Sequence, residues 1–163
     1  MADAYPMPKT FGVSNPRDFA HLSGLDYITG IREGRFPAPT IGRTMGFMMH
    51  EVEEGRVVFT GMPGEDVMNP IGTVHGGWAA TILDSALACA VHTICPVGFA
   101  STSVNLQVSF VRPILPTTGR VFCEGKVVHP GRQLATAEAR LTDEAGKLYA
   151  TGTQTCSLFK IPA

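Results

Sequence analysis

The beginning of the chain has the spacing of short helices. Asn15-Pro16 opens an expected helix at about 17–23, and Leu25, Ile28 and Ile31 at helical spacing predict a second at about 25–33. A proline-rich stretch at 1–16 precedes them and is expected to be an extended or mobile arm. Two further prolines end the second helix before residue 43.

Further along, apolar and polar residues alternate with a period of two, which is typical of strands with one buried face. The segments with this pattern are 43–53, 56–62, 102–111, 119–129, 133–142 and 148–159. Turns of hairpin length join the last three, so we expect those three to be antiparallel neighbours.

Between the second and third of these segments lies a long, alanine-rich stretch at 76–93. It has no Gly or Pro after Gly77 and therefore predicts a helix. The helix is apolar on nearly every face, so it must be buried nearly all round. A curved sheet wrapped around it would bury one side, and a partner must cover what remains.

Composition and charge narrow the class of protein. The chain has 163 residues, which suits one domain, and its net charge of −1 argues against general nucleic-acid or anionic-membrane binding. Charged residues make up only 17%, which also suggests a surface covered by another subunit. The first ten residues lack the apolar core of a secretory signal, and no apolar run reaches membrane-spanning length, so we expect a cytoplasmic protein.

The cysteines do not indicate a metal site or a disulfide framework. The sequence has four, Cys89, Cys95, Cys123 and Cys156, and none belongs to a CxxC pair. We expect them to be small apolar residues in a reducing compartment.

One acid stands alone in the apolar helix. Asp84 is the one formal charge between Asp66 and Arg112. Burying an unpaired carboxylate costs several kcal/mol or raises its pKa. A nearby hydroxyl, from Thr81 or Ser85, or an exposed edge could satisfy it, but a catalytic carboxylate lining a cleft is the favoured interpretation.

The start of the same helix is also unusual, because Gly76 and Gly77 are poor helix formers. They fit either a tight turn into the helix or a site where a ligand approaches the backbone. Unpaired amides at a helix N-terminus can stabilise the oxyanion of a polarised carbonyl. Gly77 and Asp84 lie about 10 Å apart along the axis, so action on one bond would need two subunits.

These residues belong to a stretch that resembles a known family. Residues 69–84 read NPIGTVHGGWAATILD, which is similar to the signature of hotdog-fold acyl-CoA thioesterases of the phenylacetate-degradation (PaaI-like) type. The strand at 103–110 and the turn Pro130-Gly131-Arg132 are similar to further parts of that family. The resemblance covers about 43–160 and is specific, since Asn, His-Gly-Gly and Asp match together.

The resemblance implies an α+β hotdog fold, an antiparallel curved sheet of about six strands wrapped around one long apolar helix at about 76–93. It divides the chain into an N-terminal arm with short helices at 1–42 and a hotdog thioesterase domain at 43–163. Family members form dimers, usually paired into tetramers, with active sites at the subunit interface. We therefore expect a homodimer as the minimal active unit and a homotetramer.

The implied activity is hydrolysis of an acyl-CoA thioester to a free acid and CoA, without a metal or other cofactor. Asp84 would be the general base or nucleophile, and the Gly76 amide would polarise the carbonyl. Asn69 and His75 would orient substrate, water or the neighbouring loop. Gly77 and Ser103 would lie beside the substrate, with Ser101 a weaker choice than Ser103. Arg132 would bind the CoA phosphates, with Arg112 a weaker candidate.

Two other functions remain open at this point. A hotdog hydratase or dehydratase would change the acyl chain and leave the thioester intact, and a non-catalytic acyl-CoA binding protein would release no thiol. A Ser-His-Asp hydrolase is disfavoured because the sequence has no GxSxG motif.

The identity of the acyl group, aromatic or of short or medium length, is also open. Candidates for an apolar pocket or for core packing are Phe47, Met48, Met49, Trp78 and Phe110.

Overall fold

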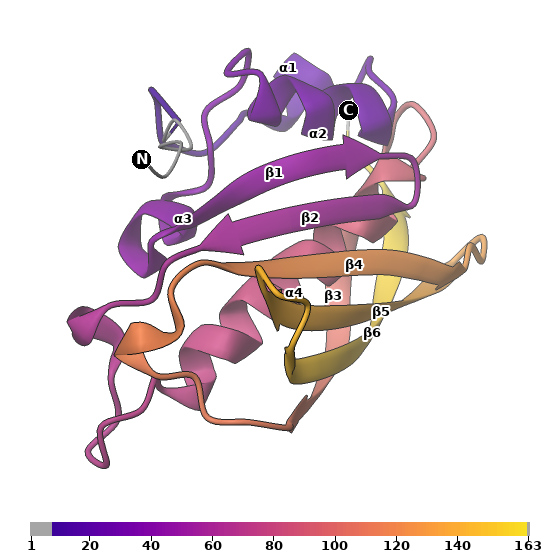
Figure 1. Ribbon diagram of the computed structural model, residues 1–163. Coiled ribbons are helices and arrows are strands. Elements are labelled where there is room, and N and C mark those ends of the chain that lie inside the picture. Colours follow the sequence, from indigo (N-terminus) through magenta and orange to yellow (C-terminus); the bar gives the residue numbers. More distant parts are fainter. Residues whose placement is uncertain (1–7, 163) are drawn as a thin grey trace.

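A single antiparallel sheet curves around one long helix in the computed structural model, which describes residues 8–162 (Figure 1). The strands are β1 (Phe47–Glu53), β2 (Arg56–Gly61), β3 (Phe99–Phe110), β4 (Val121–His129), β5 (Leu134–Asp143) and β6 (Leu148–Lys160). Their order across the sheet is β1-β2-β4-β5-β6-β3. The predicted α+β architecture is therefore confirmed, and so is the antiparallel pairing of the last three strands.

The long helix, α4 (Gly76–Thr93), lies along the concave side of the sheet (Figure 1). Ile82, Leu83 and Leu87 are fully buried between helix and sheet. Burial of each such side chain stabilises the fold by about 1.5–3 kcal/mol, so this helix anchors the core. Among residues 8–162 no helix has the length and apolar character needed to cross a membrane.

The helix passes very close to β4 at Gly125. A Cβ atom at Gly125 would lie 2.4 Å from the carbonyl oxygen of Ala86, inside van der Waals contact with the helix backbone. Gly125→Ala is therefore expected to lower the free energy of unfolding by about 2 kcal/mol or more, because helix and strand must separate. Urea unfolding measures this, with Gly64→Ala as the control, since a Cβ there meets nothing within 4 Å. Equal stability of the two variants would contradict the close approach.

The N-terminal segment contains three short helices, α1 (Pro16–Phe19), α2 (Gly24–Arg32) and α3 (Thr40–Met45). The second expected helix is confirmed, whereas the first is shorter than 17–23. The part of the expected arm at residues 1–7 lies outside the described residues. The rest of the arm is extended, and Phe11 forms a parallel bridge with Ala38.

The prediction of a strand from residue 43 was wrong at its beginning. Thr40–Met45 is helical, and Gly46 ends that helix in the left-handed conformation with φ 69°. A left-handed residue reverses the chain direction and stops a helix, and glycine adopts it without strain. The first strand therefore starts at Phe47.

The two edges of the sheet differ. At the β1 edge, α2 packs against both β1 and α4 (Figure 1). At the other edge, β3 has one neighbour, β6, and carries exposed apolar side chains. Val104 and Phe110 are each 60% exposed although their alternation predicted a buried face. Within residues 8–162, Val104 and Phe110 are thus left largely uncovered.

Candidate active site

Asp84 lies in the middle of α4 and is held by side chains from two strands. The hydroxyl of Ser103 on β3 donates to Oδ1 of Asp84 at 3.0 Å, and the side-chain amide of Gln154 on β6 donates to the same oxygen. Among residues 8–162, no hydrogen bond reaches Oδ2. One carboxylate oxygen is therefore fixed in place, and the other is left to contact water or a substrate.

The local hydroxyls on the helix do not satisfy Asp84. Thr81 donates to the carbonyl of Gly77 at 2.7 Å, and Ser85 donates to the carbonyl of Thr81 at 2.9 Å. The alternative that Asp84 is capped within its own helix is therefore wrong. Ser101, the weaker choice at the start of β3, lies 3.3 Å from Nδ1 of His92.

Gln154 is a site residue that the sequence interpretation missed. It is 2% exposed, and its carbonyl oxygen accepts from the thiol of Cys156 at 3.3 Å, which turns its NH₂ group toward Asp84. A signal was present in the alternation of β6, where threonines occupy the outward positions and Ala150, Gly152 and Gln154 the inward row. A side-chain amide in the buried row of a strand needs a hydrogen-bond partner, so its presence predicts a second polar group in the core.

A bulge in β3 positions Ser103. The pairing of β3 with β6 shifts between Ser103 and Asn105, so Val104 is the extra residue. Such bulges redirect the side chains beside them. The Asn105 side chain then accepts from the backbone N–H of Thr155 at 3.0 Å and fixes the register beyond the bulge.

Two thiols lie near Asp84 but are unsuited to act as nucleophiles. Burial, with a smaller contribution from Asp84, raises the pKa of Cys89 to about 12. Burial and the same carboxylate raise the pKa of Cys156 to about 11. Both thiols therefore stay protonated near neutral pH, and thiolate is the nucleophilic form.

The loop before α4 is organised by Asn69 and His75. The Asn69 side chain accepts from the backbone N–H groups of Ile71 and Thr73 and donates to the Thr73 hydroxyl at 2.7 Å. His75 is the N-cap of the helix, where its Nδ1 accepts from the N–H of Gly77 at 2.8 Å. In this chain both side chains orient the loop that presents Gly76.

Gly76 is the first residue of α4, and its amide is open. The neighbouring Gly77 amide donates to His75, and the Trp78 amide donates to the His75 carbonyl at 2.9 Å. No partner of the Gly76 N–H is present among residues 8–162. A Cβ at Gly76 would lie 3.0 Å from the ring of Phe110, which explains the small residue.

The predicted site residues form two groups within one chain. Asp84 and Ser103 meet in the middle of α4, whereas Asn69, His75 and the glycines lie at its start. Gly76 and Asp84 are eight positions apart, which is about 12 Å along the helix axis. One thioester carbonyl cannot contact both within one subunit.

The two arginines lie apart from each other. Arg132 is exposed in the turn between β4 and β5, beside Ile94 and Pro96 at the C-terminal end of α4. Arg112 follows β3, where its guanidinium donates to the carbonyl of Leu148 at 2.6 Å, and it borders a recess that also contains Gly76.

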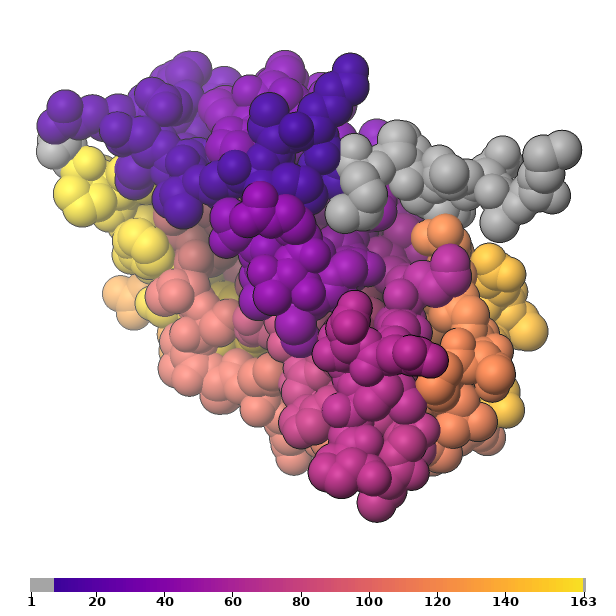
Figure 2. Space-filling model, turned by 90° about the vertical axis from the view of Figure 1, so that its left-hand side faces the viewer, coloured from indigo at the N-terminus to yellow at the C-terminus, as the bar shows by residue number. Residues whose placement is uncertain are grey.

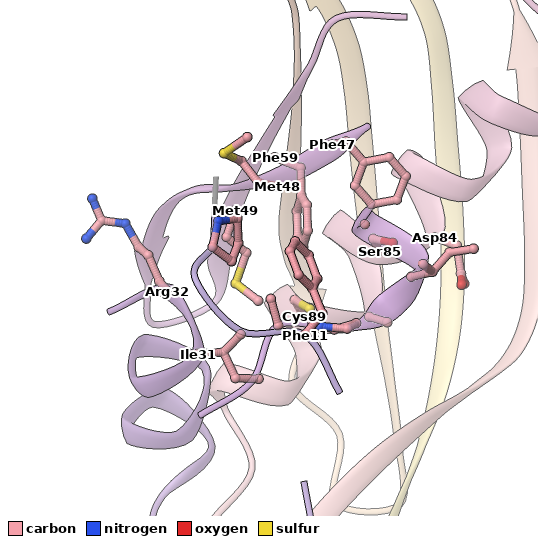
Figure 3. A pocket seen from close by; sticks show the side chains of 16 residues that line it. Phe11, Ile31, Arg32, Phe47, Met48, Met49, Phe59, Asp84, Ser85 and Cys89 are labelled. Carbon is pink, nitrogen blue, oxygen red and sulfur yellow. The ribbon is translucent and has the colours of Figure 1, made fainter. Parts of the chain in front are cut away.

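An apolar cavity of about 270 Å³ reaches Asp84. It lies between the N-terminal segment, the first two strands and α4 (Figure 3). Its lining includes Phe47, Met48 and Met49, three of the residues proposed from the sequence. Trp78 does not line it, since its indole is buried and donates to the Met45 carbonyl at 2.7 Å, and Phe110 lies against Gly76 instead.

The sequence of this chain is similar to those of known thioesterases. The model of the thioesterase superfamily matches residues 71–150. Human acyl-coenzyme A thioesterase 13 is 31% identical over 103 residues, which is 62% of this chain and 71% of that protein. The chain belongs to the thioesterase superfamily. The predicted PaaI-like hotdog identity of this thioesterase is confirmed.

Solved structures of the superfamily agree with this assignment. A phenylacetic acid degradation-related protein of Ralstonia eutropha superposes with a TM-score of 0.73 at 28% identity, covering 80% of this thioesterase and 98% of that chain. A mutant of the phenylacetic acid degradation protein PaaI of Thermus thermophilus gives a TM-score of 0.66 at 28% identity, covering 72% of this thioesterase and 97% of that chain.

Proposed function

We propose that this thioesterase hydrolyses acyl-CoA thioesters to a free carboxylic acid and CoA, with Asp84 as the general base or nucleophile. The arrangement that carries this proposal is the carboxylate of Asp84, bound through Oδ1 by Ser103 and Gln154 and open at Oδ2. A fixed carboxylate with one free oxygen can take a proton from water or attack a carbonyl carbon directly.

The two routes differ in their first bond. As a base, Asp84 accepts a proton from water while the water oxygen attacks the thioester carbon. As a nucleophile, it attacks that carbon itself and forms a mixed anhydride that water then cleaves. In both routes the carbon–sulfur bond breaks and CoA leaves as a thiol after taking up a proton.

The developing oxyanion requires a hydrogen-bond donor. The Gly76 amide is open and lies at the positive end of the α4 dipole, but about 12 Å from Asp84 along the helix axis. We assign this role to Gly76 of the partner subunit, with Gly77 adjoining the substrate. Asn69 and His75 act as positioning residues, because their hydrogen bonds hold the loop before Gly76.

The exposed edge of the sheet supports a homodimer as the minimal active unit. β3 leaves Val104 and Phe110 uncovered and has an unpaired side, and edge strands of this kind readily pair with a second chain. Phe110 contacts Gly76, so this edge and the amide adjoin. Pairing of two such dimers would give the expected homotetramer.

The remaining assignments rest on charge and chemistry. Arg132 is exposed and offers a guanidinium for a CoA phosphate, with Arg112 as the second candidate. The four cysteines are free, which suits a reducing compartment such as the cytoplasm. Within residues 8–162, no three His, Cys, Asp or Glu side chains gather as metal ligands.

The test is release of thiol from a panel of acyl-CoAs, with short, medium, phenylacetyl and benzoyl groups, in the presence of a thiol reagent. Turnover of any member supports the thioesterase proposal. Saturable binding without thiol release would favour the acyl-CoA binding protein. A changed acyl chain on an intact thioester would favour the hydratase or dehydratase.

A further inference from the structure

The cavity beside Asp84 has a wall that the family match does not include. The match begins at residue 71, whereas much of the cavity is lined by the N-terminal segment, through Phe11, Ile31 and Ile41. In Figures 1 and 2 this segment, indigo to purple, covers the end of the molecule beyond β1. We propose that this cavity is the acyl pocket and that the N-terminal segment, through Phe11, sets the largest acyl group accepted. This inference rests on the proposed thioesterase function.

The position of the cavity fits an acyl group whose carbonyl is at Asp84. Asp84, Ser85 and Cys89 of α4 form one side, and Phe47 and Met49 of β1 contribute to the wall that faces them. Asp84 lies at one end in Figure 3, and Arg32 lies at the opposite end. A thioester held at Asp84 would therefore send its acyl chain toward the N-terminal segment.

The chemistry of the lining selects an uncharged acyl group. Apart from Asp84 at its inner end, the one charged side chain of the lining is Arg32. The guanidinium of Arg32 points away from the other labelled side chains, and its Nε donates to the His50 carbonyl at 2.8 Å (Figure 3). The outer end therefore provides no inward cation for a second carboxylate, and most of the lining side chains are apolar.

The size of the cavity sets an upper limit. An apolar cavity of about 150 Å³ is enough for a benzene molecule. This cavity, of about 270 Å³, therefore has room for a ring with a short linker or for a medium-length chain. Each methylene that fits should improve kcat/KM by up to about fourfold, and longer chains must displace the wall.

Phe11 is the best-placed residue of the wall. Its backbone bridges to Ala38, and the Gly12 N–H donates to the Ala38 carbonyl at 3.0 Å. The Arg43 guanidinium lies over the Phe11 ring, 5.5 Å from its centroid. The backbone bridge and the cation therefore hold Phe11 in the wall, and truncation of its side chain enlarges the cavity.

The test measures kcat/KM for straight-chain acyl-CoAs from acetyl to palmitoyl. Phe11→Ala should move the maximum toward longer chains by about two carbons or more, since a truncated wall residue leaves space. Phe11→Trp should move it toward shorter chains. Phe19→Ala is the matched control, because Phe19 lies in the same segment but stacks on Tyr27, at 3.9 Å between ring centroids, and does not line the cavity.

The outcomes separate this inference from the function on which it rests. Opposite shifts in the two Phe11 variants, with the native profile kept in Phe19→Ala, are expected. If all three variants hydrolyse thioesters with the native chain-length profile, the N-terminal segment does not set the limit and the inference is overturned. If the native protein releases no thiol from any chain length, the proposed function itself fails, and the inference fails with it.

Discussion

Asp84→Asn is expected to lower kcat at least about 100-fold while the protein stays folded. The amide has nearly the shape of the carboxylate and keeps an oxygen that accepts from Ser103 and Gln154. It loses the basicity and the negative charge with which Oδ2 would activate water or attack the thioester. The loss therefore falls on the chemical step rather than on binding, and steady-state thiol release measures it.

A matched control separates this effect from a general change in charge. Asp18→Asn removes one carboxylate from the exposed α1 helix and should leave kcat unchanged. Circular dichroism and urea unfolding establish that both variants are folded. An Asp84→Asn protein with native kcat would remove Asp84 from the mechanism.

The same residue also allows the two chemical routes to be distinguished. A single turnover of the native protein in oxygen-18 water should place label in the product acid alone if Asp84 is a general base. Label in the carboxylate of Asp84 would identify the mixed anhydride, because water then attacks the aspartyl carbon. Mass spectrometry of the peptide that contains Asp84 gives the answer.

Gly76→Pro is expected to lower kcat by about 100- to 1000-fold, the effect of losing one oxyanion donor. Proline has no N–H, so it removes the proposed donor without removing a helical hydrogen bond. Gly76 is the first helical residue, where proline is favoured. His75 precedes it with φ −61° and ψ 135°, a conformation that a following proline allows.

Gly76→Ala is the control for this substitution. Its Cβ meets the Phe110 ring at 3.0 Å as the proline Cβ does, and that ring is exposed enough to move. Alanine keeps the N–H, so kcat should stay within a few-fold of native. If the proline and alanine variants have equal kcat, the Gly76 amide is not the oxyanion donor.

Much of the fold could be predicted because its local signals agree with one another. The stretch that forms α4 is rich in helix-forming residues and apolar on nearly every face, which predicts a buried helix. The short turns after β4 and β5 allow each strand to pair only with the next one in the sequence. The beginning of β1 could not be predicted, since Thr40–Met45 has no clear period and Gly46 alone decides where the helix ends. A single left-handed residue carries little signal in a sequence.

The charged residue of the site could be predicted, because charges are rare in this part of the sequence. Its neutral polar partner could not be predicted. Asp84 is conspicuous as an acid in an apolar helix. Gln154 is 70 residues away in the chain, and the pairing of β6 with β3 in the folded sheet brings it to Asp84. The bulge at Val104 that aims Ser103 is likewise a property of strand pairing. Phe11 lines the cavity because the arm returns to Ala38, a contact that no local pattern encodes.

The central claim is that one active site takes its carboxylate from one subunit and its amide from the other. Co-expression of Asp84→Asn and Gly76→Pro chains with different tags allows purification of the mixed dimer. Each parent homodimer should be nearly inactive. The mixed dimer contains one site with both groups intact, so it should recover about half of the native kcat per dimer. A mixed dimer as inactive as its parents would show that both groups serve a site within one chain and would contradict the account.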